Sequence, residues 1–148
     1  YDLKPEMSAL GVLNAVLESV TKKQHDLIIV NFANPDMVGH TGDIHAAIKA
    51  VETVDSAVGR LAEAVSVAGA AMLVTADHGN CEVMWDPTAN SPHTAHTTNP
   101  VPCILVNHMK DAPAQDLQNG SLVDLAPTLL ALLGIDQPDE MTGRSLII

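Results

Sequence analysis

The 148-residue sequence predicts an α/β fold in which helices cover a mostly parallel sheet. Segments with helical periodicity alternate along the chain with short apolar runs, which is the order of a layered α/β sandwich. Apolar residues make up 47% of the sequence, enough to build one aliphatic core. Two of the apolar runs are followed by polar clusters. In open α/β sheets, ligands bind at the carboxyl ends of the strands, where such clusters lie.

The spacing of apolar residues predicts three helices. The first covers residues 5–21 and has Pro5 in its first turn. The second covers residues 43–67 and ends before Gly69. Its apolar stripe, at steps of three and four, comprises Ile44, Ile48, Val51, Val54, Val58, Leu61 and Val65. The third covers residues 124–133, has Pro127 in its first turn and ends before Gly134.

Three short apolar runs predict buried strands at residues 27–30, 71–75 and 102–106. The first two are continuous rather than alternating, which is typical of parallel strands covered on both faces. Pro and Gly concentrate in residues 86–102 and 134–143, so these segments are expected to be loops within one domain.

Composition excludes several classes of function. A net charge of −11 and an aromatic content of 2% argue against binding to nucleic acid. No apolar run approaches the roughly 20 residues of a membrane-spanning helix. Cys81 and Cys103 form no C-x-x-C motif, so we expect two reduced thiols in a cytoplasmic protein. The opening at Tyr1, without a methionine, suggests a segment of a longer protein.

Three polar clusters combine aspartate and histidine, the ligands of a divalent metal such as Zn²⁺ or Mn²⁺. Asp36 and His40 lie four residues apart, Asp77 and His78 follow the predicted strand 71–75, and His96 lies in a loop after His93. Together they predict a centre with one or two ions. Each cluster alone is also compatible with a solvated turn whose aspartate caps a neighbouring amide.

Longer motifs resemble those of the cofactor-independent phosphoglycerate mutases, which belong to the alkaline phosphatase superfamily. They occupy nearly the whole chain, at residues 1–7, 34–42, 75–80, 93–102 and 124–146. The resemblance implies an alkaline-phosphatase-like three-layer sandwich, of which residues 1–148 would be the C-terminal part of the metal-binding domain.

The resemblance also implies a site and a reaction. Asp36, His40 and His96 would hold one metal, and Asp77 and His78 would contribute to a second, whereas His93 is not assigned. The family uses two Mn²⁺ ions, with Zn²⁺ or Mg²⁺ as alternatives, to interconvert 3-phosphoglycerate and 2-phosphoglycerate through a phosphoserine. Its serine nucleophile and most of its arginine-rich pocket have no counterpart in these residues, so the chain alone is expected to be inactive.

Two other functions remain open. The chain is alternatively part of another phosphatase of the superfamily or of a phosphopentomutase, although the run at residues 93–100 favours the glycolytic mutase. It is alternatively a non-catalytic module that self-associates, because an incomplete sheet exposes an unpaired edge.

Overall fold

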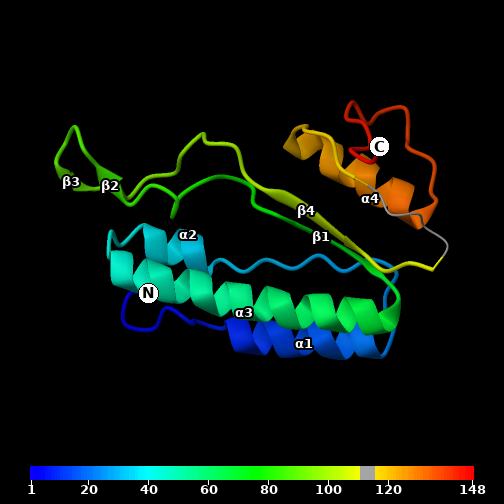
Figure 1. Cartoon of the computed structure of the whole chain (residues 1–148), viewed down its shortest axis with the longest axis horizontal. Helices are drawn as coiled ribbons and strands as arrows, with labels where there is room; N and C mark the ends of the chain where they lie inside the picture. Colours follow the sequence, from blue (N-terminus) through cyan, green and yellow to red (C-terminus); the bar gives the residue numbers. More distant parts are fainter. Residues whose placement is uncertain (111–115) are drawn as a thin grey trace.

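The computed structural model describes residues 1–110 and 116–148 of the chain. Figure 1 shows helices α1 (Ala9–Thr21) and α3 (Ile44–Ala68) side by side on one side of strands β1 (Ala71–Thr75) and β4 (Cys103–Asn107). Helix α4 (Leu125–Leu133) lies on the other side of these strands. The shorter elements are α2 (Asn34–Gly39), β2 (Trp85–Asp86), β3 (Ser91–Pro92) and the 3₁₀ turn η1 (Leu122–Asp124). The α/β class is confirmed.

The predicted helices are all present, and local signals explain their ends. Asp43 caps α3 because its Oδ1 accepts hydrogen bonds from the backbone N–H groups of His45 (2.9 Å) and Ala46 (3.0 Å). Gly69 ends the helix in the left-handed conformation, with φ of 66°. Helix α1 begins at Ala9 rather than at Pro5, because Met7 has φ of 45°, which a right-handed helix cannot contain.

The predicted buried stripe of α3 is wrong in its first half. Ile44, Ile48 and Val51 are each nearly half exposed. The buried face there consists of Ala46, Ala47 and Ala50, which pack against Val38 of α2. Small side chains let the two helices approach closely, which periodicity alone does not reveal. In the second half, Leu61 and Val65 are buried as predicted.

The prediction of a mostly parallel sheet is wrong for the strand pair that the structure describes. β1 and β4 are antiparallel, with Thr75 opposite Cys103 and Ala71 opposite Asn107. A parallel pair needs a crossover, usually a helix, to return the chain to the same end. Residues 76–102 instead turn back at the end of β1 through the small β2–β3 hairpin.

The predicted strand at residues 27–30 is not a strand of either sheet. Figure 1 shows this segment extended, running back from α1 to α2 alongside β1. No backbone hydrogen bond joins it to a strand within residues 1–110 and 116–148. Its sequence favours a strand, but a strand forms only with a hydrogen-bonded neighbour, and none of the described segments supplies one.

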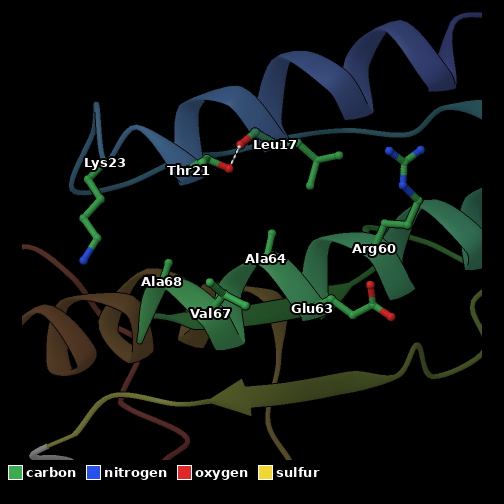
Figure 2. A pocket seen from close by; sticks show the side chains of 8 residues that line it. All are labelled: Leu17, Thr21, Lys23, Arg60, Glu63, Ala64, Val67 and Ala68. Carbon is green, nitrogen blue, oxygen red and sulfur yellow. Dashed lines mark hydrogen bonds between the residues drawn. The ribbon is translucent and has the colours of Figure 1, made fainter.

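An open pocket of about 400 Å³ lies between the C-terminal halves of α1 and α3. Figure 2 shows Lys23 and Arg60 on opposite sides of it, with apolar side chains of both helices between them. It shares no residue with the Asp/His clusters. Both cysteines are free thiols, as predicted. Within the described residues, no helix combines the length and the hydropathy that a membrane crossing requires.

Candidate metal centre

Helix α2 carries the first two residues of the candidate site. It places Asp36 and His40 one helical turn apart, so both side chains lie on the same face of the helix. The helix is held by the fully buried Val38 and by the amide of Asn34, which donates to the carbonyl oxygen of Pro5 at 2.8 Å. Its position is therefore set by the core and not by the site itself.

His96 reaches this helix from a distant loop. An isolated antiparallel bridge joins Thr97 to Gly79, and the N–H of Thr97 donates to the Gly79 carbonyl at 2.8 Å. Gly79 lies just after β1, so the bridge fixes the His96 loop at the carboxyl end of that strand. The three sequence clusters thus meet at one place.

Asp36, His40 and His96 form a compact triad. Nε2 of His96 lies 3.0 Å from Oδ1 of Asp36 and 3.0 Å from Nε2 of His40. Nε2 of His40 lies 3.2 Å from the same carboxylate oxygen. Neighbouring ligands of a tetrahedral ion with bonds of about 2.0 Å are about 3.3 Å apart. The triad therefore has the spacing of three corners of a coordination site for a divalent metal.

The backbone fixes the tautomer of His40. Its Nδ1 lies 2.6 Å from the carbonyl oxygen of Thr94, which can only accept a hydrogen bond. Nδ1 therefore carries a proton, and Nε2 is the nitrogen that faces Asp36 and His96. A carbonyl behind the outer nitrogen is the usual partner of a metal-binding histidine.

His78 lies at the edge of this triad, and the side chain of Asp77 is largely exposed beside His78. The His78 ring stacks on that of His96 with centroids 3.8 Å apart, and its Nε2 lies 3.9 Å from Oδ1 of Asp36. The Asp77 side chain is 87% exposed and lies 3.7 Å from Nε2 of His78. His93 is not a member of the triad.

The environment of Asp36 favours its charged form. Burial alone would raise the pKa of this carboxyl, but the hydrogen bond from Asn80 and the nearby His40, His96 and His78 together lower it. The amide nitrogen of Asn80 lies 2.9 Å from Oδ1 of Asp36. An ionised carboxylate is a donor that a divalent cation requires.

Sequence reasoning missed the residues that support the triad. Asn80 is buried and holds Asp36, while Cys81 donates through Sγ to the Pro35 carbonyl at 2.8 Å. Burial raises the pKa of the Cys81 thiol, so it stays a neutral donor. Glu82 accepts hydrogen bonds from the loop that carries His96. The sequence did offer one signal for these residues: they follow closely after Asp77 and His78, and residues that orient metal ligands often lie beside them.

Comparisons with known proteins place the chain in a family. The family model described as the metalloenzyme superfamily matches residues 1–137. A 2,3-bisphosphoglycerate-independent phosphoglycerate mutase of Cereibacter sphaeroides is 62% identical over 147 residues, covering 99% of this chain and 28% of that protein. The protein of that name from Rhodopseudomonas palustris is 58% identical over the same shares. The chain thus spans 28% of the length of these curated relatives.

A solved structure supports the fold. Leishmania mexicana phosphoglycerate mutase, determined at low cobalt concentration, superposes with a TM-score of 0.90 at 32% identity, over 100% of this chain and 29% of that one. The predicted alkaline-phosphatase-like architecture, as a partial domain, is confirmed by this match and by the family model.

Proposed function

Because the chain belongs to the metalloenzyme superfamily, we propose that its Asp36–His40–His96 triad holds one divalent metal ion of a cofactor-independent phosphoglycerate mutase. The observation that carries this proposal is the convergence of three donor atoms from separate parts of the chain, 3.0–3.2 Å apart. Mn²⁺ is the proposed occupant, with Zn²⁺ or Mg²⁺ as alternatives, since oxygen and nitrogen ligands suit these ions.

A second metal would be held in part by Asp77 and His78. The His78 ring stacks on that of His96, so the residues proposed for the second ion adjoin the triad. Asp77 is exposed and has room to turn towards an ion. The remaining ligands of this second site would come from residues outside the chain.

The proposed reaction is the interconversion of 3-phosphoglycerate and 2-phosphoglycerate through a phosphoserine. When bound, the ions would supply positive charge that stabilises phosphoryl oxygens and activates the attacking hydroxyl. Asp36, His40 and His96 orient the site, and the Thr94 carbonyl keeps His40 in the required tautomer. Among the described residues, none of the polar contacts of the triad involves a serine, lysine or arginine. We propose that the nucleophile lies elsewhere and that the chain alone does not catalyse the reaction.

The relatives of this chain favour a phosphoglycerate mutase over another phosphatase or a phosphopentomutase. Proteins that are 55–62% identical over nearly the whole chain are named as phosphoglycerate mutases. The substrates of the complete protein would accordingly be the two phosphoglycerates. We propose a cytoplasmic location, supported by the two free thiols.

Self-association is a second candidate property, favoured by the extended segment 27–30. Ile29 is 84% exposed, and Leu27 and Val30 are also exposed. Exposed β-branched residues with unpaired backbone groups are a template for pairing with another strand. We propose that two copies of the isolated chain cover this segment by pairing with each other.

Calorimetric titration with Mn²⁺ tests the metal proposal. The wild-type chain should bind one ion per chain weakly, and His40→Ala should bind at least about a hundredfold more weakly still, since even outer partners of a ligand contribute roughly 10–100-fold. His45→Ala is the matched control, because this exposed histidine starts α3 outside the triad. No binding by the wild type, or equal binding by His40→Ala, contradicts the proposal.

A further inference from the structure

The two loops that carry His78 and His96 are joined by little backbone structure. Two described backbone hydrogen bonds connect them: the N–H of Thr97 donates to the Gly79 carbonyl in an isolated bridge (2.8 Å), and the N–H of His93 donates to the Met84 carbonyl (3.1 Å). Two such bonds hold the loops weakly, because each backbone hydrogen bond contributes only about 1 kcal/mol net. The position of His96 relative to Asp36 must therefore depend on side chains as well.

Glu82 supplies these side-chain contacts with both carboxylate oxygens. Oε2 accepts a hydrogen bond from the backbone N–H of Asn80 at 2.6 Å. Oε1 accepts from the hydroxyl of Thr97 and from the amide of Asn99, the latter at 3.0 Å. One carboxylate thus binds the turn after β1 and also binds Thr97 and Asn99, which follow His96 in its loop.

The contact between these loops leaves no space for a larger residue. A Cβ on Gly79 would lie 2.9 Å from Cδ of Glu82 and would overlap the Thr97 hydroxyl. Gly79 is buried at this point. The absence of a side chain at this glycine lets Glu82 reach across to the second loop.

The same turn also holds the carboxylate of the triad. The Asn80 amide donates to Oδ1 of Asp36 at 2.9 Å and approaches the Asp36 carbonyl oxygen at 3.3 Å. Asn80 therefore ties Asp36 to the turn, and Glu82 ties the His96 loop to the same turn. The hydrogen bond from Thr97 and those from Asn99 and Asn80 lower the pKa of Glu82, so its charged form is the one that accepts these bonds.

We propose that Glu82 is a positioning residue that sets the distance between His96 and Asp36 without binding the ion itself. Both of its oxygens are occupied by three donors from the protein, and it is not a member of the triad. This inference rests on the proposed metal-binding function, and it assigns to Glu82 the support of one specific ligand.

The test compares Glu82→Gln with Glu52→Gln, an exposed residue of α3 that undergoes the same change in charge. Affinity for Mn²⁺, measured by calorimetry, should fall roughly 10–100-fold in Glu82→Gln and stay unchanged in Glu52→Gln. In the metal-free chain, the ring resonances of His96 should shift or broaden in ¹H–¹⁵N spectra of Glu82→Gln, while those of His45, which lies outside the triad, keep their positions.

Thr97→Val provides a second variant that changes the partner and leaves Glu82 intact. If Glu82 acts through Thr97, the double variant Glu82→Gln/Thr97→Val loses little more affinity than either single variant. Fully additive losses, or unchanged affinity and unchanged His96 resonances in Glu82→Gln, overturn the role of Glu82. Failure of the wild-type chain to bind Mn²⁺ would instead reject the metal proposal, and the His96 resonances would still report on the positioning.

Discussion

Nε2 of His96 lies 3.0 Å from Oδ1 of Asp36, although 60 positions separate the two residues in the chain. Helix α2 fixes one partner by packing Val38 into the core, and the turn after β1 fixes the other through Gly79 and Glu82. The arrangement is therefore preformed by the protein, as a metal site of defined geometry needs.

Gly39→Ala should destabilise the chain, although alanine is the better helix former. Its Cβ would lie 2.8 Å from Cγ of Asn80 and 3.0 Å from Sγ of Cys81, so α2 would be pushed off the turn that supports Asp36. Urea unfolding should show a loss of about 1–3 kcal/mol, the usual cost of overpacking. Gly59→Ala in α3, where a Cβ meets no atom within 4 Å, should gain about 0.5–1 kcal/mol. Equal effects would refute the contact.

Thr128→Val should cost about 1–3 kcal/mol by leaving a buried N–H group without a partner. The Thr128 hydroxyl donates to the Asp124 carbonyl at 2.6 Å and accepts from the N–H of Leu146 at 2.9 Å. Thr53→Val on α3 removes only an exposed hydroxyl contact and should change the free energy of unfolding by less than about 0.5 kcal/mol. Similar losses in the two variants would show that the buried link to the C-terminus contributes nothing.

The free energy of unfolding should decrease at acidic pH because of Asp124. Hydrogen bonds from the backbone N–H groups of Arg144 and Ser121 lower the pKa of this carboxyl in the folded chain. Its contribution is therefore complete above the unfolded pKa of about 3.9 and is lost as pH falls through the lower folded value. Urea midpoints measured from pH 6 downward should fall more steeply for the wild type than for Asp124→Asn. Asp55→Asn, on the exposed face of α3, should keep the wild-type slope.

Ile29→Lys should weaken self-association of the isolated chain. A lysine in the middle of segment 27–30 places a charge where a second copy would pair, which discourages strand addition. Sedimentation velocity should show a shift towards monomer. Val67→Lys on α3, where the native side chain is 91% exposed, is the control and should leave the distribution unchanged. A wild-type chain that is monomeric at all concentrations rules out this property.

Local signals explain which elements were predictable from the sequence. The ends of α3 follow from Asp43 and Gly69, and β1 follows from its apolar run, because these features depend on neighbouring residues. The lack of a described strand partner for segment 27–30 and the buried alanines of α3 were not predictable in this way, since both depend on which segments pack against them from elsewhere in the chain.

The same distinction applies to the site. The residue types and the resemblance pointed to Asp36, His40 and His96, which the fold then brings together. Glu82 was missed because its partners Thr97 and Asn99 lie 15 and 17 positions away, in a loop whose path the sequence does not specify. The bridge between Gly79 and Thr97 brings that loop next to Glu82 in the folded chain.

The most direct test of the central claim is a crystal of the chain soaked in Mn²⁺, with data collected at the manganese absorption edge. We expect one anomalous peak in contact with Oδ1 of Asp36 and with Nε2 of both His40 and His96, and we expect this peak to disappear in His96→Ala. A peak elsewhere, or no peak at a concentration that saturates the calorimetric titration, would contradict the claim that this triad is a metal site.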